Sequence, residues 1–220
     1  MKLLPYRSMR LIKDNLIIIT IVAVTVLGFF GVVFMASSQE RKDEEAQVVD
    51  INELVTANTN VKGQATASAT LVEFSDFQCP ACGAFYPIIK QLELKYKNEL
   101  KIAYKHFPLP QHTYAQKAAE AAEAAGEQGK FWEMHDALFE NQEHLTAEDL
   151  KKYAAELGLD TEKFNQALDS GKFANKVKED LTLGNKIGIN ATPTFYLNGK
   201  KLLIREGTDI EKAILQELGR

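Results

Sequence analysis

The hydrophobic residues of this chain form one long uninterrupted run and several shorter periodic ones. The long run covers residues 16–36, about 21 uncharged residues, enough to span a ~30 Å hydrocarbon core as a helix. Basic residues precede it, at Lys2, Arg7, Arg10 and Lys13, and acidic residues outnumber basic ones just after it. The positive-inside rule therefore predicts a cytoplasmic basic segment over residues 1–15, a single transmembrane signal-anchor over residues 16–36, and an extracytoplasmic remainder.

A cleaved signal peptide is the alternative for this segment. Ala36 and Ser38 are small enough to stand before a cleavage site. The apolar run is longer than the roughly 7–15 residues usual in signal peptides, which favours the uncleaved anchor. Both alternatives put the rest of the chain in an oxidising compartment, where a reactive pair of thiols can be kept as a disulfide.

Residues 37–67 are polar and small, and only VVDINELV, residues 48–55, is weakly apolar and able to form a short helix or strand. We expect residues 37–67 to be a tether with limited structure. A flexible chain of about 30 residues has an r.m.s. span of roughly 30 Å, so the domain behind it could reach partners near the membrane.

A globular pattern begins at residue 68 and continues to residue 220. TLVEF, residues 70–74, is a short apolar run typical of a buried central strand. The apolar residues of 83–98 recur at helical spacing, and KIAYKHFPL, residues 101–109, predicts a second strand. Strand, helix and strand with short connections form a βαβ unit, which favours parallel pairing of the two strands.

The region that follows, about residues 113–187, has a helical pattern and is too long for a loop, so it predicts an inserted helical subdomain. Within it, Thr146 and Asp149 resemble an acidic capping box, and Gly158 stands where a helix would end in a left-handed residue.

Two β-rich runs then flank Asn198-Gly199, the strongest short hairpin signal, and residues 208–219 predict a final helix. The sequence thus predicts an α/β fold.

Composition limits the possible classes of protein. With 220 residues, 45% hydrophobic and 25% charged, the chain can bury one ordinary core with an appended subdomain. A formal net charge of -4 without a long basic run argues against binding of nucleic acids. Two cysteines are too few for a disulfide scaffold, so their value lies in chemistry or in one local bridge.

The two cysteines, Cys79 and Cys82, stand in EFSDFQCPAC, where the first predicted strand meets the following helix. The sulfur of Cys79 would there meet the positive end of the helix dipole and free backbone N–H groups, which favour the thiolate. Cys82, one turn later and more enclosed, could close an intramolecular disulfide and release a partner held as a mixed disulfide. This spacing suits a reversible redox pair.

Two other roles for the cysteines stay open at this point. A permanent bridge over so short a loop would restrict the unfolded chain little. A zinc site would need two more ligands, and the histidines (His106, His112, His135 and His144) offer neither a second C-x-x-C nor an HExxH pattern. We therefore predict no metal and no cofactor, and we expect each histidine to be a surface or packing residue.

A second candidate feature is ATPT, residues 191–194, immediately before a β-rich run. Proline in or before a strand is unusual. A cis Thr192–Pro193 bond would turn the chain sharply and leave backbone groups of Thr192 free to pair with an extended substrate near Cys79. A trans proline at the strand entry is the alternative, because most X-Pro bonds are trans.

Four stretches together closely resemble the membrane-anchored DsbA-like thiol:disulfide oxidoreductases: EFSDFQCPAC, HFPLPQH, AAEAAGEQGKFWEMHDALF and GINATPTFYLNGK. The resemblance runs from about Thr70 to the C-terminus. It implies a thioredoxin fold interrupted by a helical domain. It also implies that Cys79 is the exposed nucleophile, that Cys82 is the buried resolving cysteine, and that Thr192 and Pro193 form the family's cis-proline loop.

The resemblance also bears on three other residues. Glu73 matches a buried acidic position behind the active site, from which it could relay protons to the resolving thiol; the alternative is a solvated carboxylate at the end of a strand. Phe131 and Trp132 match a family signature, and we expect them to pack the helical insertion rather than to contact substrate.

One departure from the family concerns the active-site loop, Pro80 and Ala81. The best-known strongly oxidising relatives carry histidine where Ala81 stands. An imidazole there can stabilise the reduced form, so without it the reduction potential should shift toward more reducing values. For this two-electron couple, every ~30 mV of potential corresponds to about 1.4 kcal/mol of free energy. The direction of electron flow is therefore left open by the sequence.

The leading hypothesis is a membrane-anchored oxidase that acts on cysteine pairs of exported proteins through a Cys79–Cys82 disulfide. The resemblance implies reoxidation by a quinone-linked membrane protein of the DsbB or VKOR kind. A reductase or isomerase of the same fold is the nearest alternative. A tethered peptide-binding chaperone with a merely structural Cys79–Cys82 bridge is the non-catalytic one.

Overall fold

The computed structural model describes residues 21–22, 24–32 and 47–220, and it divides into two units, Met1–Ala46 and Gln47–Arg220. In the first unit, residues 21–22 and 24–32 are helical. Among the described residues, no helix has both the length and the apolar character that crossing a membrane requires. The predicted basic segment (1–15) and much of the predicted anchor (16–36) lie outside the described residues, so both stay predictions.

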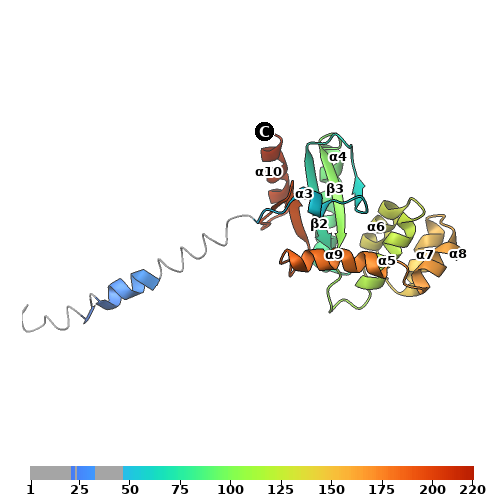
Figure 1. Cartoon of the computed structure of the whole chain (residues 1–220), viewed down its shortest axis with the longest axis horizontal. Helices are drawn as coiled ribbons and strands as arrows, with labels where there is room; N and C mark the ends of the chain where they lie inside the picture. Colours follow the sequence, from blue (N-terminus) through green and yellow to red (C-terminus); the bar gives the residue numbers. More distant parts are fainter. Residues whose placement is uncertain (1–20, 23, 33–46) are drawn as a thin grey trace, which may run out of the picture. The chain divides into compact units, whose positions relative to one another are not determined.

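The second unit is built around a five-stranded sheet with the strand order β1-β3-β2-β4-β5 (Figure 1). Its strands are β1 (Asn60–Lys62), β2 (Ala69–Ser75), β3 (Leu100–His106), β4 (Thr194–Leu197) and β5 (Lys200–Lys201). β2 and β3 pair in parallel, whereas the other neighbours are antiparallel. All seven residues of β2 are buried, which explains why TLVEF reads as a nearly continuous apolar run.

Helices cover both faces of this sheet and build a separate layer beside it (Figure 1). They are α3 (Ile51–Leu54), α4 (Pro80–Lys95), α5 (Ala115–Gly126), α6 (Phe131–Glu140), α7 (Ala147–Glu156), α8 (Thr161–Asp169), α9 (Ala174–Lys186) and α10 (Thr208–Glu217). Ile89 of α4 and Ile210 of α10 pack with Leu71 of β2 on one face of the sheet. Leu54 of α3 packs with Val72 and Tyr196 on the other face. The predicted βαβ unit, β2-α4-β3, is confirmed.

The local signals for turns and caps are confirmed as well. Asn198 and Gly199 have φ values of 48° and 86°, the left-handed pair that a two-residue hairpin turn between β4 and β5 requires. Thr146 caps α7 in a capping box with Asp149, and Gly158 is left-handed with φ 68°.

The predicted helical insertion consists of α5 to α9. Its core is held by α5, whose alanines let neighbouring helices approach closely: Ala118, Ala121, Ala122 and Ala125 are at most 1% exposed. They pack with larger side chains of the other helices, among them Met134 and Phe164. The protein is therefore an α/β thioredoxin fold with an inserted helical region.

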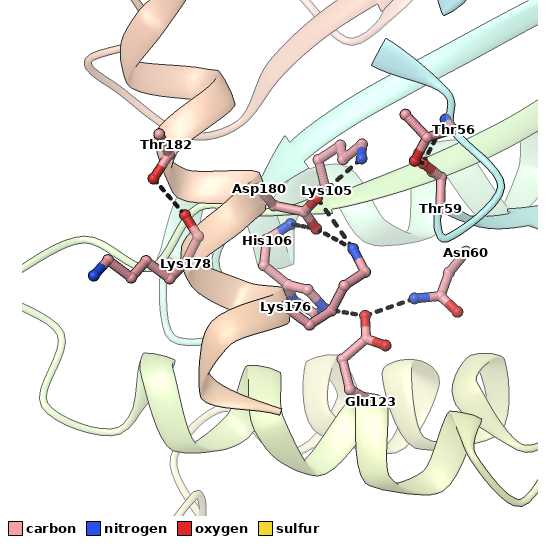
Figure 2. Close-up of polar contacts among 10 residues, drawn as sticks. All are labelled: Thr56, Thr59, Asn60, Lys105, His106, Glu123, Lys176, Lys178, Asp180 and Thr182. Atoms are coloured by element: carbon pink, nitrogen blue, oxygen red, sulfur yellow. Dashed lines mark hydrogen bonds and ion pairs between the residues drawn. The ribbon is translucent and has the colours of Figure 1, made fainter. Parts of the chain in front are cut away.

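A buried charge cluster joins the insertion to the sheet (Figure 2). Asp180 of α9 accepts hydrogen bonds from Nζ of Lys105 on β3 at 2.9 Å and from Nζ of Lys176 at 3.1 Å. The Lys105 and Asp180 side chains are each only 3% exposed. Removing one partner of such a pair leaves a buried charge without compensation, at a cost of ~3–5 kcal/mol, so Lys105 and Asp180 each require the other where α9 packs on β3.

The segment before β2 corrects part of the expectation of a tether over residues 37–67, whereas residues 37–46 lie outside the described residues and their part of it stays a prediction. From Gln47 on, the chain belongs to the folded unit, and β1 adds an antiparallel strand to the edge of the sheet beside β3. Asn60 Nδ2 donates to Glu123 Oε1 of α5 at 2.7 Å, and this carboxylate also lies 2.9 Å from His106 Nε2 (Figure 2). A polar strand of three residues has no hydrophobic periodicity, so the sequence pattern gave no sign of it.

Candidate active site

The Cys79–Cys82 pair lies where β2 passes into α4, as the sequence predicts. Cys79 is the N-cap residue of α4 and Pro80 is its first residue, a position where the missing N–H costs nothing. Cys79 is 7% exposed and Cys82 is fully buried, and both are free thiols. The first sulfur is therefore the one that another protein can reach.

The ATPT segment lies against this helix start. The Thr192–Pro193 peptide bond is cis, which confirms the prediction made for it. The Cys79 Sγ lies 3.5 Å from the backbone oxygen of Thr192, across 113 positions of sequence. The fold thus brings the cis-proline loop and the first cysteine together.

The two thiols have opposite electrostatic environments. A hydrogen bond from Cys82, together with donors from Thr192 and the backbone N–H groups of Ala81 and Cys82, lowers the pKa of Cys79 from 9.0 to about 5. Burial raises the pKa of Cys82 well above its ordinary value, and the Cys79 sulfur beside it raises it further. At pH 7, Cys79 is a thiolate and Cys82 a protonated thiol, an asymmetry suited to thiol–disulfide exchange.

Glu73 lies within β2, where it is paired with Tyr104 of β3 and Phe195 of β4. It is 3% exposed, so the alternative of a solvated carboxylate at a strand end is wrong. Burial raises the pKa of Glu73 to about 7, and the charge of Glu73 in turn contributes to the raised pKa of Cys82. A group that titrates near neutral pH beside a buried thiol can accept and return a proton.

A small cleft of about 10 Å³ borders this carboxylate. Lys62, Lys90, Trp132 and His135 are among the residues that line it with Glu73. Lys62 Nζ lies 4.5 Å from the centroid of the Trp132 ring. Trp132 thus borders the cleft and also packs against the cores of the insertion and of one face of the sheet. Sequence reasoning missed its place at the cleft. Phe131, 4% exposed, packs inside the insertion as expected.

The burial of Glu73 should make stability depend on pH. In the unfolded chain this carboxyl loses its proton near pH 4.5, whereas in the folded protein it keeps it up to about pH 7. The folded state thus binds the extra proton between these values, so stability falls as pH rises through this window, by about 3 kcal/mol for a shift of this size. Urea unfolding of the wild type and of Glu73→Gln should show the wild type losing this amount relative to the variant between pH 4.5 and pH 8.

The matched control for that comparison is Glu133→Gln, which removes an exposed carboxylate from α6. Its pH profile should follow that of the wild type. If the gap between the wild type and Glu73→Gln were the same at pH 4.5 and pH 8, the assignment of a raised pKa to Glu73 would be wrong.

The active-site turn is held by side chains that sequence reasoning missed. The fully buried carboxylate of Asp76 accepts hydrogen bonds from the backbone of Gln78 at 2.7 Å and of Leu109 at 2.8 Å. It also lies 2.7 Å from His112 Nδ1. Asp76 and His112 therefore bring EFSDFQCPAC and HFPLPQH into direct contact. The presence of both stretches in the family resemblance was the only sequence signal that these two side chains act at the site.

The other histidines are packing or surface residues. His106 is buried against Glu123, and His144 is exposed. His135 is buried among aromatic rings, and this burial lowers its pKa to about 4. Over residues 21–22, 24–32 and 47–220, no group of three or more His, Cys, Asp or Glu side chains could hold a metal ion.

Comparison with protein families and solved structures gives one consistent likeness. A family model described as thioredoxin matches residues 56–216. The oxidised form of BdbD from Bacillus subtilis is similar at 27% identity and a TM-score of 0.70, over 80% of this chain and 98% of that one. The thiol-disulfide exchange protein alpha-DsbA2 from Wolbachia pipientis shares the fold, with 19% identity and a TM-score of 0.66, over 76% of this chain and 90% of that one.

Relatives of known name include much longer chains. The Na(+)/H(+) antiporter NhaA 3 of Salinispora tropica is 41% identical over 143 residues, 64% of this chain and 22% of that protein. The Na(+)/H(+) antiporter NhaA of Herminiimonas arsenicoxydans is 34% identical over 188 residues, 84% of this chain and 30% of that protein. This chain thus spans less than a third of the length of these curated relatives.

Proposed function

This chain belongs to the DsbA-like thiol:disulfide oxidoreductases of the thioredoxin family, and we propose that it works as an oxidase of cysteine pairs in exported proteins. The observation that carries the proposal is the lowered pKa of Cys79, about 5 against 9.0. A thiolate held at pH 7 stabilises the reduced form by about 3 kcal/mol relative to an ordinary thiol. That corresponds to a disulfide more oxidising by about 60 mV, opposite in direction to the effect of the missing imidazole at Ala81.

The proposed reaction transfers two electrons from the substrate to the Cys79–Cys82 pair. Of the two protons that the substrate thiols lose, one goes to Cys82 and the other to solvent, because Cys79 stays a thiolate. A substrate thiolate attacks Sγ of Cys79, the Cys79–Cys82 bond breaks, and Cys82 leaves as a thiolate that takes a proton through Glu73. The second substrate thiolate then attacks the substrate sulfur of the mixed disulfide. Its disulfide forms, and Cys79 leaves as a thiolate. The Thr192 backbone is suited to pair with the substrate during both steps, because it lies beside Cys79.

For turnover, a membrane protein linked to quinones, of the DsbB or VKOR kind, would take the electrons back. We place the enzyme at the cytoplasmic membrane, anchored by residues 16–36 with the N-terminus inside and the catalytic unit outside. In the described part of that segment, Ile21, Leu27, Phe29 and Phe30 are 58–71% exposed, and a helix that is apolar all round suits a membrane. Relatives named as Na(+)/H(+) antiporters carry a similar domain, which also fits work beside a membrane.

The nearest alternative is a reductase or isomerase with the same residues. Ala81 favours it, because alanine offers no charge to the thiolate of Cys79. The two functions require different reduction potentials, so one measurement separates them.

The test is the reduction potential of the Cys79–Cys82 pair in the full chain, equilibrated in glutathione buffers and followed by alkylation of free thiols. We expect a potential well above the ~-270 mV of thioredoxin, toward the ~-120 mV of strong oxidants. A potential near or below that of thioredoxin would favour the reductase. A pair that glutathione does not reduce at all would favour the structural bridge of a tethered chaperone.

A further inference from the structure

We propose that Gln142, in the turn between α6 and α7, is a positioning residue that holds the catalytic turn and thereby keeps Cys79 in its thiolate form. The proposal rests on the redox role of Cys79. It gives the helical insertion a part in the chemistry of an active site whose cysteines belong to the thioredoxin core.

The contacts of Gln142 are made to the backbone of the active-site turn. Its Nε2 donates to the carbonyl oxygen of Phe77 at 2.8 Å and to that of Cys79 at 2.9 Å. An amide nitrogen has two hydrogens, so one side chain can satisfy both carbonyls with both of its donors. These two carbonyls belong to the residues on either side of Gln78, at the point where the chain leaves β2 and starts α4.

Gly83 shows that the site is shaped for this amide. A side chain at Gly83 would place its Cβ on the Oε1 of Gln142, so only glycine leaves room for the amide in its present position. Glycine inside a helix is less favourable than alanine, and here no positive φ requires it. The Gly83 N–H donates to the same Cys79 oxygen at 3.1 Å. Gly83 of α4 and Gln142 of the insertion therefore donate to the same oxygen, the carbonyl oxygen of Cys79.

The position of that carbonyl matters for the sulfur. The hydrogen bond from the Cys82 side chain stabilises the thiolate of Cys79 most, and the backbone N–H groups of Cys82 and Ala81 add to it. The direction of these two N–H groups depends on the orientation of the first turn of α4. Gln142 fixes the peptide groups on either side of Gln78 and so fixes that orientation. Without it the turn can rotate, the two donors weaken, and the thiolate loses stability relative to the thiol.

The experiment measures the Cys79 thiolate by its absorbance at 240 nm during a pH titration of the full chain, together with the equilibrium constant against glutathione. In Gln142→Ala we expect the titration midpoint to rise by about one pH unit. The equilibrium constant for reduction of the pair by glutathione should fall about tenfold, which corresponds to a reduction potential lower by ~30 mV. Gln142→Glu, with a negative charge beside the turn, should raise the midpoint further.

The matched control is Gln128→Ala. Gln128 also makes two hydrogen bonds to backbone, donating to the Asp160 oxygen at 3.2 Å and accepting from its N–H at 2.8 Å, but both lie within the insertion. Its loss should leave the midpoint and the equilibrium constant as in the wild type. If Gln142→Ala also left both unchanged, Gln142 would have a structural role only and the proposal would be overturned.

Gly83→Ala tests the same contact without removing Gln142. It should displace the amide and reproduce the shift of the Gln142→Ala midpoint, and the double variant should show no larger shift than either single one. Additive shifts in the double variant would overturn the proposal. The outcome is independent of the direction of electron flow: a wild-type potential near that of thioredoxin would contradict the proposed oxidase and leave the Gln142-dependent shift in place.

Discussion

A Cys79→Ser protein is expected to oxidise dithiol substrates no faster than the uncatalysed background. The attack of a substrate thiolate needs an accessible sulfur in a disulfide, and serine can form none. Cys82 cannot take over, because it is fully buried and burial holds its pKa far above the pH of the assay. The measurement uses the oxidised full chain in excess over a fluorescent peptide with two cysteines, and follows the loss of free peptide thiols with time.

The matched control is Ala81→Ser, which puts the same hydroxyl into the same turn at an exposed position and leaves both sulfurs in place. This variant should retain oxidation within a few-fold of the wild type. Circular dichroism and urea unfolding show whether Cys79→Ser is folded. Substantial peptide oxidation by a folded Cys79→Ser protein would mean that another group receives the substrate thiolate, and the proposed reaction would be wrong.

The parts of the site that the sequence predicts share one physical property: each is encoded within a few consecutive residues. Cys79, Cys82 and Pro80 follow a buried strand and begin a helix, and the dipole and backbone donors at that junction are consequences of local geometry. The hairpin turn at Asn198-Gly199 is local in the same way. A pattern of a few residues is therefore enough to predict the fold around the first cysteine.

The parts that the sequence leaves out depend on contacts between distant residues. Gln142 donates to backbone carbonyls 63 and 65 positions away, and a glutamine in a polar turn has no pattern that distinguishes this use from solvation. β1 is a polar segment that pairs with β3 at the edge of the sheet, without a hydrophobic face of its own. The acidic role of Glu73 lies between these cases. Its match to a buried acidic position of the family suggested both burial and chemistry, but only the covering helices and strands make it buried.

The second large effect is expected in Cys82→Ser, where the Cys79 thiolate can still attack a disulfide of a substrate, one substrate sulfur leaves as a thiolate, and the resulting mixed disulfides should accumulate. In the wild type, Cys82 lies one turn after Cys79 and can attack the mixed disulfide, so an adduct that fails to proceed is released. Serine removes this route of release and keeps a hydroxyl that can replace the hydrogen bond Cys82 makes to the Cys79 thiolate. Adducts should rise at least tenfold, as seen on non-reducing gels after acid quenching and alkylation of cell extracts.

Cys82→Ala separates the two roles of this residue, because it also removes release but offers no donor to Cys79. The hydrogen bond from Cys82 is the largest cause of the lowered pKa of Cys79, so this variant should have a higher Cys79 pKa than Cys82→Ser and should form adducts more slowly near pH 6. In Cys79→Ser, where only the buried sulfur remains, no adducts are expected. Equal adduct levels in Cys79→Ser and Cys82→Ser would mean that substrates reach both sulfurs, and the division into an attacked and a resolving cysteine would fail. Adducts confined to the variants that keep Cys79 would instead show that substrates react at the more exposed sulfur, Cys79, and that the buried Cys82 acts only afterwards, when it releases the adduct.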